Sequence, residues 1–333
     1  MSNPNSEFQA PPPPPIQAEP KAPRPTKLRP VAIGLFVVGL IVFITGIAKI
    51  LPGGLVTGLI FAFWGILLFA FSFIPLPQIT GAEEAPLSAL QRLTGIFYEP
   101  TRVFKNLRVH PRWLAALLVL GSVNAVYTAA FVQRLTPEYI VDFQMEKLAD
   151  SPIKPAPDKM EAAKENALQQ AKQPIQRIQT AAKSFVGVFV FASIVAALCL
   201  LGVLAFGGRI NFWQAFVAVL YAYVPIAVIS KLLSLVILYL KSPDDIHPVL
   251  GAETLVQDNL GVLFAPAQHP ALYVLGTSIG VLSFYGLWLR SRGLANASQK
   301  VSSSAAWGVT ITLWVLGLIL GMILATLFSS FFS

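Results

Sequence analysis

Charged residues are scarce in this chain of 333 residues, in which Asp, Glu, Lys and Arg make up only 12% of the total. In an ordinary soluble domain, charged residues make up about a quarter of the total. Hydrophobic residues make up 55%. With one cysteine and three histidines, neither a disulfide framework nor a metal cluster of cysteine and histidine is expected. This composition argues against an ordinary soluble domain and predicts a membrane protein.

The motifs of common enzyme chemistry are absent as well. No Gly-Lys-Ser/Thr phosphate loop, Gly-x-Ser-x-Gly elbow or His-Glu-x-x-His sequence occurs. His110, His247 and His269 each precede a proline, a pair that is typical of the start of a helix. We therefore expect no catalytic residue, no metal site, no cofactor and no nucleic-acid partner, and a protein that is not an enzyme.

Seven apolar segments are each long enough to cross a bilayer, which takes about 20 helical residues. The sequence thus predicts an all-α fold, a polytopic membrane helical bundle with seven transmembrane helices. The first two, within 31–75, are joined by a Pro-Gly-Gly turn and should form a hairpin. The predicted spans lie near residues 31–51, 55–75, 112–132, 183–206, 212–233, 269–289 and 306–330.

The segments outside the spans indicate an orientation. Residues 1–30 hold five consecutive prolines and four basic residues, which is typical of a disordered tail. With this tail inside, the inside regions and their boundaries hold thirteen Lys and Arg against five Asp and Glu, whereas the outside regions hold ten against eleven. Basic residues favour the cytoplasmic side. We expect the N-terminus inside and the C-terminus outside.

Residues 86–108 combine apolar and basic side chains in the pattern of a helix that lies at a membrane surface. Pro100 should divide this segment into two short helices. Lipid contact is one interpretation of the segment, and docking of a cytoplasmic protein is the other. The expected anchors on an anionic leaflet are Arg92, Arg102, Lys105 and Arg108.

The segment 133–182 is expected to form an outer cap of two helices. Thr136 is a good N-cap residue, and Pro137 suits the first helical position. A proline-rich linker at 151–157 should separate the two helices.

Polar residues within the spans are candidates for a working site. Lys231 lies roughly 28 Å along a helix that starts at Phe212, close to the far edge of a hydrocarbon core about 30 Å thick. We expect it to anchor the helix at the outer interface. Pro225 should kink the helix. It, the nearby Tyr221 and Tyr223, and Asn124 in another span are the candidates for lining a cavity or packing site.

Three stretches resemble the Yip1 domain family of five-span membrane proteins. The first is Phe97-Tyr-Glu-Pro-Thr-Arg-Val-Phe-Lys-Asn-Leu-Arg-Val-His-Pro-Arg-Trp-Leu114. The second, and the most specific, pairs Gln214-Ala-Phe216 with Tyr221-Ala-Tyr-Val-Pro225. The third is Trp288-Leu-Arg-Ser-Arg-Gly-Leu294, similar to the small basic loop before the family's final helix. The resemblance covers about residues 86–330 and implies a five-helix domain behind the tail and the hairpin.

None of these motifs is catalytic, so the resemblance implies a fold and no reaction. The Asp-Leu-Tyr-Gly-Pro signature of the eukaryotic members, which are linked to Rab GTPases and vesicle traffic, is absent. A Rab-binding role is therefore not expected. The chain looks like the bacterial type, which implies a bacterial cytoplasmic (inner) membrane.

Two functions are compatible with these features. The leading hypothesis is a non-enzymatic scaffold or membrane-organising protein that binds membrane lipids or a cytoplasmic protein partner. The alternative is a permeability or transport factor for a small solute, a lipid or an ion. Its path would be lined by Asn124, Tyr221, Tyr223 and Pro225. Homo-oligomerisation is left open.

Overall fold

The computed structural model describes residues 26, 28–48, 50, 54–76, 85–150, 156–172, 174–298 and 300–329. Every regular element within these ranges is a helix and none is a strand, which confirms the predicted all-α class. The predicted tail lies almost entirely outside the described residues, as does most of the 151–157 linker.

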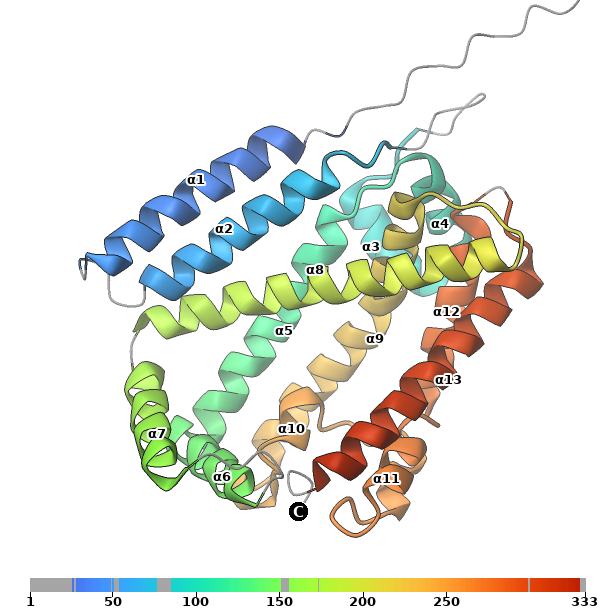
Figure 1. The fold of residues 1–333 in the computed structure, drawn as a ribbon. Coiled ribbons are helices and arrows are strands. Elements are labelled where there is room, and N and C mark those ends of the chain that lie inside the picture. Colours follow the sequence, from blue (N-terminus) through green and yellow to red (C-terminus); the bar gives the residue numbers. More distant parts are fainter. Residues whose placement is uncertain are drawn as a thin grey trace, which may run out of the picture.

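The two N-terminal helices, α1 (Leu28–Ile47) and α2 (Gly54–Phe71), lie side by side as an antiparallel pair (Figure 1). Glycines allow the close approach. A Cβ atom built on Gly39 would meet the backbone of Ala62, and one on Gly58 would meet the backbone of Phe43. The predicted hairpin is therefore present as two tightly packed helices.

The predicted division at Pro100 is confirmed. Helix α3 (Ala89–Tyr98) begins with a capping box, in which the Ser88 hydroxyl accepts a hydrogen bond from Gln91 N at 3.1 Å. Pro100 then opens α4 (Pro100–Val109). The two helices pack against α9 (Phe212–Leu240), and α4 also packs against α12 (Val281–Asn296). Much of their apolar face is thus covered by protein: Ile96, Val103, Phe104 and Leu107 are buried.

The centre of the bundle is formed by α5 (Leu114–Leu135), α8 (Pro174–Ala205) and α9, each packed against the other two. The C-terminal α13 (Ser303–Leu327) packs against α8 and α12. By length and composition, five helical segments in the described residues can cross a membrane: Leu28–Ile47, Leu114–Leu135, Ala182–Ala205, Phe212–Leu240 and Ser303–Leu327.

The predicted span at 269–289 is not one helix. The structure divides it into α11 (Pro270–Thr277) and α12, with Gly280 in an extended conformation between them. The physical reason is a loop that is distant in sequence: Asn259 pairs with Gly280, and the Asp258 carboxylate accepts a hydrogen bond from Leu282 N at 2.7 Å. Helix α12 also continues to Asn296, so the segment between the last two predicted spans is partly helical.

Two helices form the predicted cap region, α6 (Pro137–Ala149) and α7 (Pro157–Lys172). Thr136 caps α6 by accepting a hydrogen bond from Tyr139 N at 3.4 Å, and Pro137 is the first helical residue. An ion pair of 2.8 Å between Lys164 and Asp142 joins the two helices. Short elements follow α9: η1 (Pro243–Asp245), α10 (Leu250–Glu253) and η2 (Leu260–Leu263).

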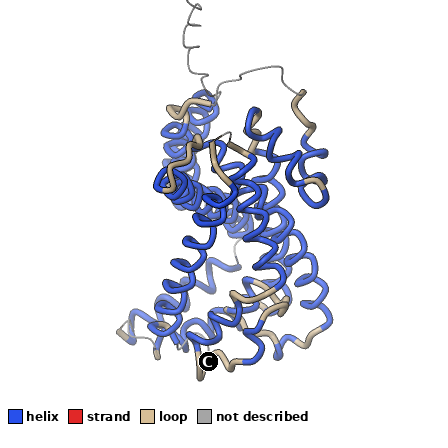
Figure 2. Tube along the Cα trace, turned by 90° about the vertical axis from the view of Figure 1, so that its right-hand side faces the viewer, coloured by secondary structure: helices blue, strands red, loops and turns tan. Residues whose placement is uncertain are grey.

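The connections gather at two ends of the bundle. Helices α3 and α4 lie at one end, whereas α6, α7, α10 and α11 lie at the other (Figure 1). At the first end Arg209 N donates to Lys300 O at 3.0 Å, which joins the α8–α9 turn to the α12–α13 loop. Figure 2 shows the same helical layout from the side.

Between the two ends, large apolar side chains remain on the surface of the long helices. Ile41 of α1, Leu201 of α8 and Leu320 of α13 are each 57–62% exposed. Soluble proteins rarely expose apolar surface on this scale. Backbone groups inside helices need no water, so such a surface suits hydrocarbon.

Candidate functional site

The first residues of α9 hold the end of the bundle together. Asn211 caps the helix by accepting a hydrogen bond from Trp213 N at 2.9 Å. The Gln214 amide accepts one from Asn211 N at 3.0 Å and donates one to Arg108 O at 3.0 Å. The Trp213 indole donates to Ile74 O at 3.0 Å. The start of α9 therefore fastens both the end of α4 and the segment after α2.

A cluster of aromatic rings surrounds this start. Trp213 and Trp113 are stacked with their ring centroids 6.4 Å apart. Phe216 meets both rings edge to face, and Phe189 meets Trp113 and Phe216 in the same way. Phe71 of α2 contacts Phe189, with 5.4 Å between centroids. The hairpin is thus attached to the rest of the fold through aromatic packing, where such ring pairs add to the stabilisation from burial.

Arg92 departs from its predicted role as a lipid anchor, because it is buried in protein with only 3% of its surface exposed. Its Nε donates to the Tyr221 hydroxyl at 3.1 Å, and its Nη1 donates to Leu87 O at 2.6 Å. Tyr221 in turn donates to Arg112 O at 3.1 Å. A guanidinium out of contact with water needs such partners. Arg92 and Tyr221 therefore connect α3 to α9.

The other predicted anchors of this segment lie nearer the surface. Arg102 is exposed and pairs with Glu99 at 3.0 Å, and Lys105 is exposed too. Arg108 is half-buried. Their role at a membrane surface stays a prediction.

Lys231 lies beside a loop at the opposite end of the bundle. Its ammonium group donates hydrogen bonds to the carbonyl oxygens of Ala252, at 3.5 Å, and Glu253. It also lies 4.2 Å from the centre of the Tyr127 ring, a cation–π contact. Lys231 thus fixes the α10 region to α5 and α9. Its position relative to a membrane interface stays a prediction.

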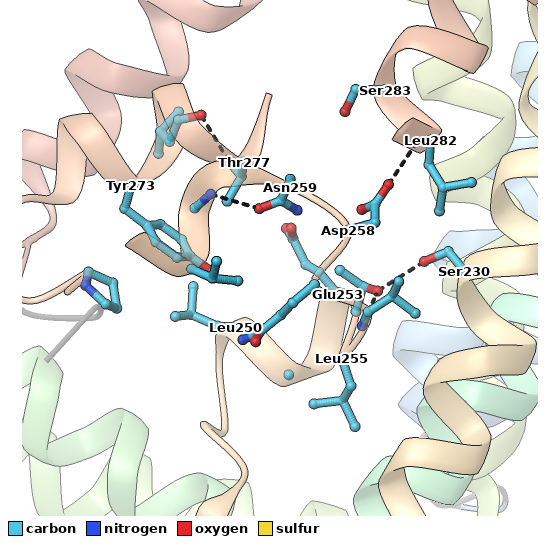
Figure 3. Close-up of a pocket in the computed structure, with 18 of the residues that line it drawn as sticks. Ser230, Leu250, Glu253, Leu255, Asp258, Asn259, Tyr273, Thr277, Leu282 and Ser283 are labelled. Carbon is cyan, nitrogen blue, oxygen red and sulfur yellow. Dashed lines mark hydrogen bonds between the residues drawn. The ribbon is translucent and has the colours of Figure 1, made fainter. Parts of the chain in front are cut away.

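A cavity of about 1170 Å³ lies between α9, α11, α12, α13 and the loop that contains α10 and η2. Figure 3 shows its loop end, where Glu253, Asp258 and Asn259 approach Ser230 of α9 and Tyr273 of α11. The Ser230 hydroxyl lies 2.9 Å from the Thr254 hydroxyl, which holds the loop to α9.

The opposite part of the cavity contains a cation. Arg290 of α12 donates a hydrogen bond from Nη2 to the Tyr223 hydroxyl at 3.0 Å, and its guanidinium carbon lies 5.4 Å from the centre of the Tyr223 ring. Both residues line the cavity. The Arg290 Nε is buried and has no hydrogen-bond partner among the described residues.

Of the four residues predicted to line a cavity or packing site, Tyr223 lines the cavity described above. Tyr221 points to Arg92 in the fold interior. Pro225 is a buried residue inside a continuous α9. Asn124, on α5, is half-buried. The other three residues do not line this cavity, and their role in any polar path stays a prediction.

Arg290 was not predicted as a site residue, because its segment reads as a basic loop before the last span. One feature could have placed it in a helix: no proline occurs after Pro270. The segment 281–296 also contains Leu, Trp and Arg, which tolerate helical geometry. Together with the absence of proline, these residues favour a helix that continues through 281–296. The structure also places the carboxylates of Glu253 and Asp258 in the cavity lining.

No group of three or more histidine, cysteine or carboxylate side chains within the described ranges is placed to hold a metal ion. Apolar helices of spanning length, packed in a bundle with loops at two ends, define a multi-pass integral membrane protein.

The Yip1 domain family model matches residues 94–325, so the chain belongs to the Yip1 domain family. Searches among curated proteins and among solved structures find no match. The family assignment agrees with the resemblance seen in the sequence. The Gln214 and Tyr221 contacts give a structural role to two of the residues that carry it.

Proposed function

We propose that this protein is a non-enzymatic scaffold of a bacterial cytoplasmic membrane, which meets lipid or a cytoplasmic partner through α3 and α4. In this proposal the chain crosses the membrane seven times. The α2 helix and the divided pair α11–α12 supply the two crossings beyond the five long helices, with the N-terminus inside.

One observation carries the proposal. The inner face of α3 and α4 is fixed in the fold, yet Leu90, Phe97 and Tyr98 stay 41–71% exposed. The exposed basic residues Arg102 and Lys105 follow on α4. We call these five residues the α3–α4 platform. A rigid surface with apolar and basic side chains suits an anionic membrane surface. It equally suits a protein that docks there.

A photoreactive phenylalanine analogue at position 98 tests the proposal in native membranes. Tyr139 of α6, which is 41% exposed at the opposite end, is the matched control position. We expect adducts of anionic lipid or of a defined protein at position 98, reduced by Arg102→Gln with Lys105→Gln, and a different set at position 139. The same adducts at both positions, or none at position 98, would overturn the proposal.

The cavity supports a second candidate, a permeability factor for a solute, a lipid or an ion. Tyr223 lines it, and polar groups lie at its loop end. Purified protein in liposomes should then conduct a test ion or solute, and Tyr223→Phe should reduce the flux. Liposomes that stay as tight as protein-free ones would remove this candidate.

A further inference from the structure

The cavity that contains Arg290 combines one cation with a largely apolar wall. On α9 the lining residues Ala222, Ile226 and Ser230 are four apart, so they share one helical face. Leu287 of α12 and Trp314 of α13 complete the wall around the cation. The volume of about 1170 Å³ exceeds the usual range of roughly 300–1,000 Å³ for small-molecule sites. The space therefore suits a long apolar ligand better than a small polar one.

The charge of Arg290 is not neutralised by protein. Among the described residues no carboxylate forms an ion pair with it, and Tyr223 is its hydrogen-bond partner. A hydroxyl group and a ring face compensate a cation only in part. A cation at membrane depth is costly unless it is paired or reaches water. An anionic group in the cavity would lower this cost.

The position of Arg290 fits the headgroup level of a leaflet. Phe104 of α4 packs at Gly293, since a Cβ built there would lie 3.1 Å from the Phe104 ring. Arg290 precedes Gly293 by three residues, which is about 4.5 Å along a helix. A surface helix lies roughly 5–10 Å into the boundary between headgroups and acyl chains. If α4 lies in that zone, Arg290 is just beneath it.

The other end of the cavity is acidic. Asp245, Glu253 and Asp258 line it together with one cation, Lys241, and the Asp258 carboxylate accepts a hydrogen bond from Leu282 N at the start of α12. Leu282 and Arg290 are eight residues apart, or roughly 12 Å along the helix. A soluble anion that came from the aqueous side of this loop would meet these carboxylates first. An anion that came from the membrane would not.

We propose that Arg290 and Tyr223 bind the phosphate of an anionic phospholipid, whose acyl chains lie along the apolar wall of the cavity. The guanidinium donates to phosphate oxygens, and the Tyr223 hydroxyl orients the guanidinium. This site rests on the proposed placement of α4 at the membrane surface, but it uses none of the side chains of the α3–α4 platform.

The test measures lipid binding to the full chain in detergent by native mass spectrometry. The probes are phosphatidylglycerol, phosphatidylcholine and inorganic phosphate. We expect phosphatidylglycerol to bind more tightly than phosphatidylcholine, and Arg290→Gln to weaken it by roughly tenfold or more, the loss expected for a charge-assisted hydrogen bond. Tyr223→Phe should weaken it a few-fold.

Arg292 supplies the matched control on the same helix. It is exposed, and its guanidinium lies 5.8 Å from the centre of the Trp288 ring. Arg292→Gln should leave phosphatidylglycerol binding unchanged. Equal binding to wild type and Arg290→Gln would overturn the proposal. So would equal binding of the two lipids, or Arg290-dependent binding of inorganic phosphate.

A second measurement covers the case in which Arg290→Gln fails to fold. A photoreactive phosphatidylglycerol is crosslinked to the wild-type chain, and the labelled peptides are mapped. Labels on α9 and α12 residues that line the cavity support the site. Labels confined to α1 and α2 would overturn it.

Discussion

Buried polar side chains connect helices that are distant in the sequence. Tyr221 shows this most clearly, because its hydroxyl accepts from Arg92 and donates to Arg112 O. In a low-dielectric interior each of these groups would be costly without the others. The Tyr221 hydroxyl therefore holds α9 to the segments around α3 by hydrogen bonds.

We predict that Tyr221→Phe lowers the free energy of unfolding by about 1–3 kcal/mol, because it leaves the buried Arg92 Nε without its partner. Arg102→Gln removes an exposed ion pair and should cost only about 0–1 kcal/mol. Thermal unfolding in detergent, followed by tryptophan fluorescence, checks both. An equal loss of unfolding free energy in the two variants would contradict this structural role of Tyr221.

His247 makes the stability of the folded state depend on pH. Its Nδ1 accepts hydrogen bonds from Val249 N and Leu250 N, both at 3.2 Å. Phe143 packs on the ring, and burial and then the nearby charge of Lys147 lower the pKa of His247. A proton on Nδ1 would remove both acceptor bonds. The folded state thus favours the neutral ring.

Because the folded pKa lies below the unfolded one, the unfolded state binds more protons and stability rises with pH. The contribution of neutral His247 to the stability of the folded state is complete above about pH 6.5 and is lost as the pH falls below this value. We predict a lower melting temperature at pH 5 than at pH 7, with a smaller difference in His247→Gln. His269→Gln, which alters an exposed residue, should keep the wild-type difference. An unchanged difference in His247→Gln would contradict this.

Sequence patterns located the charged residues but not their surroundings. Arg92 and Arg102 belong to the same amphipathic segment, yet one is buried and the other exposed. What distinguishes them is the Tyr221 hydroxyl, which belongs to another helix. Tyr223 was predicted as a cavity residue because it lies close to Pro225. Its partner Arg290 is far away in sequence, and local patterns do not show such pairs.

At the scale of helices, the α1–α2 pair depends on small residues at the contact. Gly54 approaches Val42 O and Gly46, and Gly58 approaches Phe43. A side chain at these points would separate the two backbones. Small residues of this kind allow close helix packing where lipid offers no hydrophobic driving force.

We predict that Gly58→Leu destabilises the hairpin, with a cost of about 1–3 kcal/mol or more, which is typical of overpacking. Gly34→Leu is the control, because a Cβ there meets nothing within 4 Å. The midpoint of thermal unfolding in detergent checks the pair. If Gly34→Leu lowers the midpoint of thermal unfolding as much as Gly58→Leu does, close packing at Gly58 is not the cause.

The long helices could be predicted from hydropathy, because an apolar run of 20 or more residues leaves few alternatives. The α3–α4 pair followed from Pro100, and α6 from Thr136 and Pro137. The break between α11 and α12 could not be predicted this way. It depends on Asn259 and Asp258, which reach Gly280 and Leu282 from a separate loop.

For the molecule as a whole, the two groups of loops divide the surface into two ends. Arg102 and Lys300 are at the end that contains α3 and α4, and Lys159 and Asp244 are at the end that contains α6 and α10. If the bundle crosses the membrane, these ends face opposite compartments.

We predict opposite sidedness in a labelling experiment on native membranes. Cys199 is buried, so Cys199→Ala gives a background without cysteine. A membrane-impermeant thiol reagent should label Arg102→Cys and Lys300→Cys from the cytoplasmic side only. It should label Lys159→Cys and Asp244→Cys from the outer side only. Labelling of both pairs from one side would contradict the seven-span arrangement, and exchange of the sides would reverse the orientation.

The backbone bond between Arg209 and Lys300 also sets an order for biogenesis. Residue 209 leaves the ribosome long before residue 300, so this bond, and the one from the Ser298 hydroxyl to Arg209 O, form only after α12 has been synthesised. The α8–α9 turn therefore lacks these two hydrogen bonds until the segments between it and Lys300 have been synthesised. Helix α13 follows Lys300 directly in the sequence, so the contacts that close this end of the bundle are made late in assembly.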